Sequence, residues 1–107
     1  MCRQNFKFEM AASQSQKSRD FVSGTLRGPN GKFNPITSVP GIGEVSASAL
    51  AKTGFKTVGP LMGQFLLLEC DEELMAAWLR DKLPSSVQGS FIDQAVSGLS
   101  QWARMHL

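Results

Sequence analysis

Residues 40–45 are the part of this chain whose residue types and spacing best suit the binding of an anion. They read P-G-I-G-E-V, with a glycine on each side of Ile42, directly before a stretch with helical periodicity. The first backbone N–H groups of a helix lack partners within the helix, and together with the helix dipole they attract negative charge. Because glycine has no Cβ, a phosphate oxygen can reach these amides. The same residues also suit an ordinary interhelical turn, and their spacing alone does not separate the two interpretations.

A helix on each side of this turn would make it a helix-hairpin-helix, which holds the backbone of a duplex without reading its bases. In that interpretation Ile42 is buried and fixes the turn, while the amides beside Gly41 and Gly43 stay open to a phosphate. Glu44 falls in the first turn of the following helix, where a negative charge suits the dipole.

Residues for catalysis or metal binding are scarce in this chain. It has one histidine, His106, and two cysteines, Cys2 and Cys70, which are too few for a disulfide scaffold or a metal cluster. Cys70 is expected to be an unpaired thiol. No Walker loop, G-x-S-x-G motif or nucleophile–base pair can be assembled. Trp78 and Trp102 are interpreted as core residues rather than as platforms for bases. We therefore expect no enzyme, no cofactor and no metal site.

Length and composition fit one globular domain. The chain has 107 residues, and no apolar run approaches the ~18–20 residues of a membrane span, so we expect no membrane insertion. The N-terminus lacks the apolar region of a signal peptide, which favours the cytosol or the nucleus. Residues 1–56 carry eight basic and three acidic groups, whereas residues 57–107 carry three basic and six acidic groups. This asymmetry suits a basic face for a polyanion, and a solvated basic tail would give the same count.

The hydrophobic periodicity predicts an all-α, compact domain of about five helices that must position the turn. Ser13 or Ser15 is expected to cap a first helix that ends at Val22. Residues 23–38 are rich in Gly, Pro and Asn and predict a loop. A structureless loop of this length is unusual in a compact domain, so we expect it to be either mobile or functional. Later helices are expected to begin near residues 44, 57, 71 and 87–90. Residues 1–14 are expected to be a flexible N-terminal extension, and residues 15–107 the helical domain.

Two of these helices have a predicted inner face. The helix that follows the turn is expected to end at Gly54 and to bury Val45, Ala49 and Leu50. The helix capped by Asp71 is expected to bury Leu74, Trp78 and Leu79.

The helix predicted over residues 57–68 is apolar in almost every direction, through Leu61, Met62, Phe65, Leu66, Leu67 and Leu68. A helix that is apolar on all sides must be buried on all sides, and one small domain has little material to cover it. A symmetric partner subunit would explain this pattern. A central core helix in a monomer would explain it as well.

Seven short segments occur in an order that resembles one known family. They are SQKSRDFV (15–22), GIGEV (41–45), GF (54–55), GQFLLL (63–68), DEEL (71–74), WL (78–79) and LSQW (99–102). Together they resemble the barrier-to-autointegration factor family over residues 15–107.

The resemblance implies a small all-helical homodimer in which each subunit presents a helix-hairpin-helix to double-stranded DNA. The two sites of such a dimer lie on opposite sides, so that it bridges two duplexes without sequence preference. The family also binds lamins and the LEM-domain proteins of the inner nuclear membrane. This implies a location in the nucleus, at chromatin and the nuclear envelope, and also in the cytoplasm.

Position by position, the resemblance assigns roles to residues of this chain. The expected DNA-binding residues are Gln16, Lys17, Gly41, Ile42, Gly43, Val45, Ser46 and Lys52. The expected dimer interface consists of Gly63, Gln64 and Leu67, and the groove for the LEM partner of Leu67, Leu74 and Trp78. Ser15 matches a phosphorylated serine, and a phosphate there would add roughly −1.5 to −2 charge and repel a duplex.

The chain departs from the family where the family carries cations. The departures are Ser48, Ala49, Glu69 and Cys70 in place of lysines, and Asp93 in place of an arginine on the DNA side. Each lost phosphate contact removes about 0.9 units of log–log salt slope. We therefore expect weaker duplex binding than in a typical member, with part of the lost charge supplied by the N-terminal tail and by Arg27 and Lys32.

Two hypotheses about function remain open at this point. The first is a sequence-independent DNA-binding dimer that bridges duplexes, which the intact GIGEV segment favours. The second is a paralogue that binds DNA weakly and acts as a protein-interaction dimer for LEM-domain proteins, which Ala49 and Asp93 favour.

Overall fold

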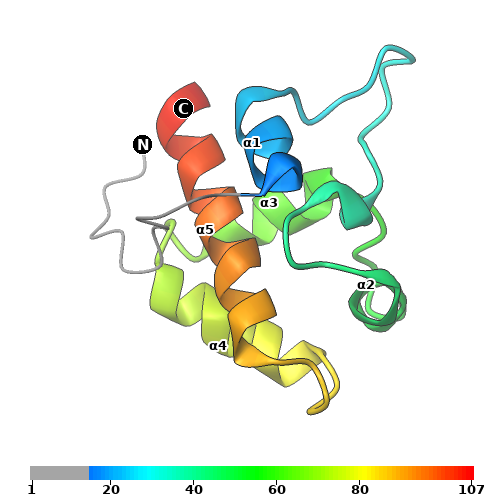
Figure 1. Cartoon of the computed structure of the whole chain (residues 1–107), viewed down its shortest axis with the longest axis vertical. Coiled ribbons are helices and arrows are strands. Elements are labelled where there is room, and N and C mark those ends of the chain that lie inside the picture. The colour runs from blue at the N-terminus through cyan, green and yellow to red at the C-terminus, as the bar shows by residue number, and fades with distance from the viewer. Residues whose placement is uncertain (1–14) are drawn as a thin grey trace.

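Helix α5 is the longest element of the fold, and α1 and α4 pack against it (Figure 1). The computed structural model describes residues 15–107, so the expected extension over residues 1–14 lies outside the described residues. The elements are α1 (Gln16–Ser23), the 3-10 turn η1 (Ile36–Ser38), α2 (Glu44–Ala51), α3 (Val58–Leu67), α4 (Glu72–Lys82) and α5 (Gly89–His106). The described part of the chain contains two isolated bridges and no strand, which confirms the predicted all-α fold with five helices. None of its helices is long and apolar enough to cross a membrane.

The helix boundaries follow from local capping. The Ser15 Oγ accepts a hydrogen bond from the Ser18 N–H at 3.1 Å, and the Asp71 Oδ1 accepts one from the Leu74 N–H at 3.0 Å. These bonds satisfy amides that a helix start leaves without partners. The chain leaves α2 through Gly54, whose φ of 96° suits a residue without a side chain. The predicted caps at Ser15 and Asp71 and the stop at Gly54 are confirmed.

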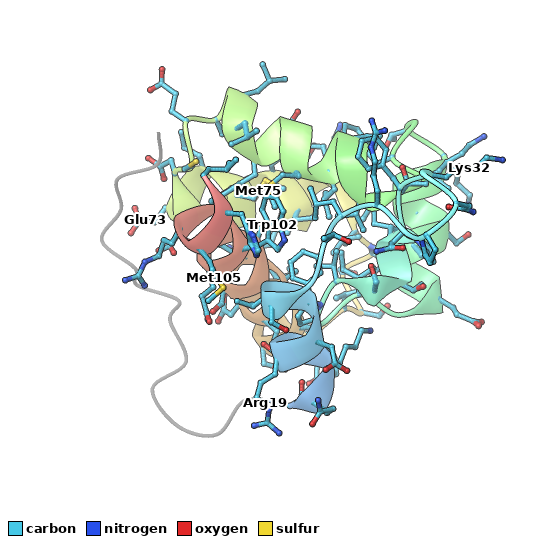
Figure 2. All side chains as sticks on the ribbon, turned by 90° about the horizontal axis from the view of Figure 1, so that it is seen from above. Arg19, Lys32, Glu73, Met75, Trp102 and Met105 are labelled. Atoms are coloured by element: carbon cyan, nitrogen blue, oxygen red, sulfur yellow. The ribbon has the colours of Figure 1, made fainter. Side chains whose placement is uncertain are left out.

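Side chains from all five helices fill the core. Leu50, Leu61, Phe65, Leu79 and Leu99 have no exposed surface. Trp102 fastens the end of α5 to the end of α1, because its Nε1 donates to the Gly24 carbonyl at 3.0 Å. The ring of His106 stacks on Trp102 with centroids 4.4 Å apart. Trp102 and Met75 point into the molecule in Figure 2, whereas Lys32 projects from it. Trp102 therefore has a structural role, as predicted.

Two side chains that were expected to be buried are exposed. Val45 is 62% exposed and Leu74 is 53% exposed, while Ser46 lies inside at 4%. Helix α2 has only eight residues, most of them small or apolar, so its periodicity does not decide which face turns inward. In α4 the inward positions belong to Met75 and Leu79, which are four residues apart. The predictions that Val45 and Leu74 face the core are wrong.

The segment that precedes α4 contains a second correction. Glu69 and Cys70 follow α3 with φ of 57° and 61°, a conformation that is uncommon for residues other than glycine. Cys70 is buried and disulfide-bonded. The expectation of an unpaired thiol at Cys70 is therefore wrong.

The loop over residues 23–38 is ordered by its own backbone and is not structureless. An isolated antiparallel bridge pairs Arg27 with Phe33, and the Gly28 N–H donates to the Lys32 carbonyl at 2.8 Å. The Arg27 guanidinium lies over the Phe33 ring at 4.7 Å. The sequence did not predict this small hairpin, because the turn residues in it are compatible with many loop conformations.

Replacement of Gly59 by alanine should loosen the loop from α3. A Cβ at Gly59 would lie 2.5–2.7 Å from three ring atoms of Phe33, so the ring would have to move. We expect Gly59→Ala to lower the free energy of unfolding by about 1–3 kcal/mol, measured by urea denaturation. In a Phe33→Ala background the loss should vanish. An equal loss in both backgrounds would show that the Phe33 contact is not its cause.

Candidate nucleic-acid interface

The turn before α2 is held against the first turn of α5. Gly41 has a φ of 81°, and a Cβ there would collide with the carbonyl oxygen of Phe91. Only glycine allows both this conformation and this close approach. Ile42 is 1% exposed, and its N–H donates to the Val39 carbonyl at 3.1 Å. Ile42 is therefore buried and fixes the turn, as predicted from the sequence.

The start of α2 presents open backbone amides. Gly43 is the N-cap and makes no side-chain cap, and a Cβ at this position would meet nothing within 4 Å. Within residues 15–107, the N–H groups of Gly43, Glu44 and Val45 donate to no backbone carbonyl outside the helix. Amides of this kind at a helix start favour an anion. The element before the turn, η1, is a single 3-10 turn of three residues.

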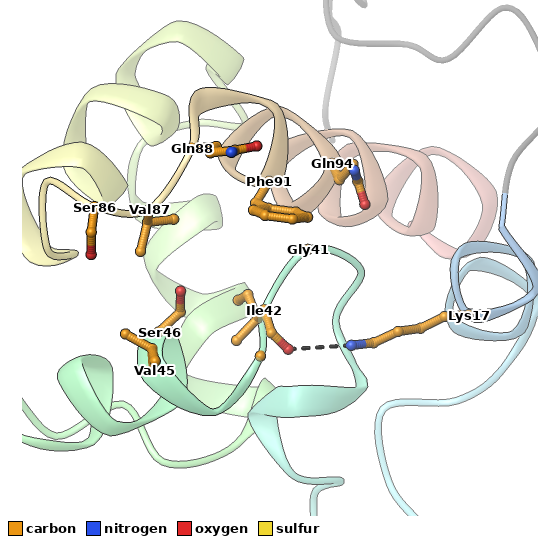
Figure 3. Close-up of a pocket in the computed structure, with 11 residues that line it drawn as sticks. Lys17, Gly41, Ile42, Val45, Ser46, Ser86, Val87, Gln88, Phe91 and Gln94 are labelled. Atoms are coloured by element: carbon orange, nitrogen blue, oxygen red, sulfur yellow. Dashed lines mark hydrogen bonds between the residues drawn. The ribbon is translucent and has the colours of Figure 1, made fainter.

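Lys17 is brought to the turn from the other side, by α1. Its Nζ donates to the Ile42 carbonyl at 3.2 Å, a contact between residues 25 positions apart (Figure 3). This bond holds an ammonium group beside the open amides. The capping of α1 by Ser15 fixes where Lys17 leaves the helix. This hydrogen bond joins α1 to the turn before α2, and both segments contain residues that were predicted to bind DNA.

A pocket of about 470 Å³ opens between these elements, as Figure 3 shows. Its lining residues are Lys17, Gly41, Ile42, Gly43, Val45, Ser46, Ser86, Val87, Gln88, Phe91 and Gln94. Six of the eight predicted DNA-binding residues are in this set. The other two are outside it, because Gln16 bonds within α1 to Asp20 at 2.7 Å and Lys52 is the C-cap of α2.

The far wall of the pocket was not predicted from the sequence. It comes from residues 86–88 and from Phe91 and Gln94 of α5. These positions carry no motif, and only the packing of α5 on the turn brings them to the site. The close approach of Gly41 to Phe91 is the contact that joins the two walls.

The electrostatics of the pocket are simple. None of its lining residues is acidic, and Lys17 is the one cation among them. Asp93, which was expected on the DNA side, is half-buried and does not line the pocket. Its Oδ1 is buried without a hydrogen-bond partner. The residues that line the pocket therefore carry no negative charge.

A family model described as barrier to autointegration factor matches residues 12–106 of this chain. This chain belongs to the barrier-to-autointegration factor family. The human barrier-to-autointegration factor is 41% identical over 76 residues, which cover 71% of this chain and 80% of the human protein. Barrier-to-autointegration factor 1 of Caenorhabditis elegans is 34% identical over 91 residues, which cover 85% of this chain and 94% of the worm protein.

The residues expected to bind protein partners of a barrier-to-autointegration factor lie on α3 and α4. Leu67 is 78% exposed and Leu74 is 53% exposed, while Gly63 and Gln64 are half-buried. Trp78 is half-buried and packs edge-on against Phe55 with ring centroids 4.9 Å apart. Large apolar side chains exposed in this way are typical of a protein interface.

Proposed function

We propose that this protein binds double-stranded DNA without sequence preference and, as a homodimer, bridges two duplexes in chromatin and at the nuclear envelope. The observation that carries the proposal is the set of open amides at Gly43, Glu44 and Val45, beside Lys17, on a pocket with no acidic lining residue. These groups match a backbone phosphate in charge and in hydrogen bonding. Family membership supports the same function.

The donors of the site explain the lack of sequence preference. Backbone amides and an ammonium group bind phosphate oxygens, which are the same at every base pair. Reading bases requires side chains that enter a groove and match the edges of the base pairs. The turn instead presents glycines and the buried Ile42. In this proposal η1, the turn and α2 act as a helix-hairpin-helix.

The homodimer is proposed to form through α3. Leu66 is 43% exposed and Leu67 is 78% exposed, although both lie on a helix whose other leucine, Leu61, is fully buried. A second copy of the chain would cover these side chains, and a two-fold interface would use the same patch twice. Each subunit would then contribute one DNA site, which is what bridging requires.

The remaining proposals concern partners and regulation. Leu67, Leu74 and Trp78 would form the groove for LEM-domain proteins, and lamins would be further partners at the nuclear envelope. Ser15 would be a phosphorylation site, since it is exposed at the start of α1, two residues before Lys17. A phosphate there would place negative charge beside the DNA site and weaken binding.

A second candidate function is a protein-interaction dimer that binds DNA weakly. One observation favours it: Lys17 is the only cation among the residues that line the pocket. Salt-titrated binding to short duplexes of random sequence separates the two functions. Micromolar or tighter binding at moderate salt, equal for different sequences, supports the first, and no binding under those conditions contradicts it.

Replacement of Lys17 by alanine should reduce the salt dependence of DNA binding. Because Lys17 would neutralise one phosphate per site, the log–log salt slope should fall by about 0.9 per subunit, with a several-fold loss of affinity at moderate salt. Lys82→Ala is the matched control, because it also removes one lysine. Lys82 lies on α4 over the Trp78 ring and does not line the pocket. If both variants change the slope equally, Lys17 has no specific contact with a phosphate.

A further inference from the structure

The hairpin over residues 25–34 is closed by hydrogen bonds at both of its ends. At its base the Asn34 side-chain amide donates to the Thr25 carbonyl at 3.1 Å. At its tip the Asn30 Oδ1 accepts a hydrogen bond from the Lys32 N–H at 3.0 Å. Because these bonds fix the backbone of the hairpin, the side chains on it project from defined positions.

Phe33 fastens the hairpin to the start of α3. Its ring packs directly on Gly59, where a Cβ would lie 2.5–2.7 Å from three ring atoms. Directly after the hairpin, Pro35 pairs with Thr57 in an isolated antiparallel bridge. This pairing places Lys56, which precedes Thr57 in the chain, beside the base of the hairpin.

Three cations lie on or beside the hairpin without acidic neighbours in the sequence. Arg27, Lys32 and Lys56 are exposed, and none of them forms an ion pair within residues 15–107. Lys32 projects from the molecule in Figure 2. Residues 21–68 contain one acidic residue, Glu44, which is in the first turn of α2. Unpaired positive charge of this kind attracts a polyanion.

A second hollow connects the base of the hairpin to the proposed phosphate site. This pocket of about 470 Å³ has Lys17 and Asp20 of α1 in its lining, together with Thr25 and Asn34 of the hairpin. Lys17 also lines the pocket beside the open amides of α2, so the two hollows meet at this lysine. Asp20 is the one acidic residue in the lining of the second hollow. Because its carboxylate would repel a phosphate, we expect contacts on the hairpin and not inside this hollow.

We propose that the hairpin is a second DNA-contacting element, separate from the turn before α2. Arg27, Lys32 and Lys56 bind backbone phosphates of the duplex that the turn holds, on the far side of Lys17. The inference rests on the proposed function, because the same duplex is its ligand. A two-stranded ribbon of this kind also has a shape that the major groove of B-DNA admits.

An acidic protein segment has the same sign of charge as DNA, but the hairpin suits it less well. Protein interfaces have an apolar centre. The aromatic ring of the hairpin, Phe33, packs on Gly59 and has the Arg27 guanidinium over it at 4.7 Å, so it offers a protein partner little surface. Poly-glutamate is therefore the second ligand in the test.

The test compares two double variants of the full-length chain. Arg27→Ala with Lys32→Ala removes one arginine and one lysine from the hairpin, and Arg80→Ala with Lys82→Ala removes the same two residue types from the last turn of α4. Lys32→Ala is also measured alone, because the Lys32 side chain makes no hydrogen bond or ion pair within residues 15–107 and its loss leaves the hairpin intact. One arm measures binding to a random duplex over a range of salt, and the other measures binding to poly-glutamate.

We expect the hairpin double variant to lower the log–log salt slope by about 1.8 per subunit and to weaken duplex binding roughly tenfold at moderate salt. Lys32→Ala alone should lower the slope by about 0.9. The double variant of α4 should bind the duplex like the wild type.

Equal duplex binding by the two double variants would overturn the inference while the proposed function stands. Loss of binding to poly-glutamate alone would overturn it as well and would assign the hairpin to an acidic protein segment. A wild type that binds no duplex would overturn the proposed function and the inference together. If the hairpin double variant loses duplex binding but Gly43→Glu does not, the turn is excluded and the hairpin contact stands.

Discussion

Gly43→Glu should abolish detectable binding to duplex DNA while the protein stays folded. Gly43 is the N-cap of α2, its φ of −99° is open to any residue, and a Cβ there meets nothing within 4 Å. The new side chain therefore has room, and its carboxylate would stand beside the amides proposed to hold a phosphate. Repulsion between two unit charges at contact distance lowers affinity on the order of 100-fold. Fluorescence anisotropy with a labelled duplex measures the loss.

Gly43→Gln is the control for this substitution. It has nearly the same size and shape as glutamate but no charge, so it reports any steric block by itself. We expect Gly43→Gln to bind more weakly than the wild type and much more tightly than Gly43→Glu. Both variants should unfold at the temperature of the wild type to within a few degrees, because no atom of the protein is displaced. Equal binding by the wild type and Gly43→Glu would show that the segment is only a turn.

Gly63→Glu should convert a dimer into a folded monomer. A Cβ at Gly63 meets nothing within 4 Å, so the side chain fits the isolated subunit, and glutamate favours a helix more than glycine does. In a dimer through α3 the carboxylate would be buried without a partner, which raises the dissociation constant on the order of 100-fold or more. Light scattering should give twice 11.6 kDa for the wild type and 11.6 kDa for the variant.

A second pair of variants separates loss of the interface from a general change of the surface. Leu67→Glu should also give monomers, because Leu67 is the most exposed leucine of α3. Leu107→Glu replaces a leucine that is 50% exposed at the end of the chain, and it should leave the dimer intact. The monomeric variants should still bind one duplex but no longer hold two duplexes together. A wild type that is monomeric, or a dimeric Gly63→Glu, would contradict the proposed interface.

The parts of the fold that depend on neighbouring residues could be predicted from the sequence. The caps at Ser15 and Asp71 and the turn around Ile42 follow from bonds between residues a few positions apart. The burial of Ile42 between two glycines follows from the same local pattern. The resemblance to a known family then assigned roles to residues that local patterns alone would have left open.

The parts that depend on long-range packing could not be predicted in this way. The inward face of α2 was assigned to Val45 rather than to Ser46, because a short helix of small residues fits the core in more than one rotation. The wall formed by Val87 and Phe91 has no sequence signal, since it exists only where α5 packs on Gly41. Asp93 stands where the family has an arginine on the DNA side, and it does not line the pocket.

The most direct test of the phosphate-binding turn is a titration of the ¹⁵N-labelled protein with a short random duplex, followed by its backbone amide resonances. We expect the largest shifts at Gly43, Glu44 and Val45, and we expect the same resonances to shift with a second duplex of unrelated sequence. If the resonances of these three amides do not shift while those of Arg27 and Lys32 do, the duplex is bound by the charged loop. That result would contradict the central claim.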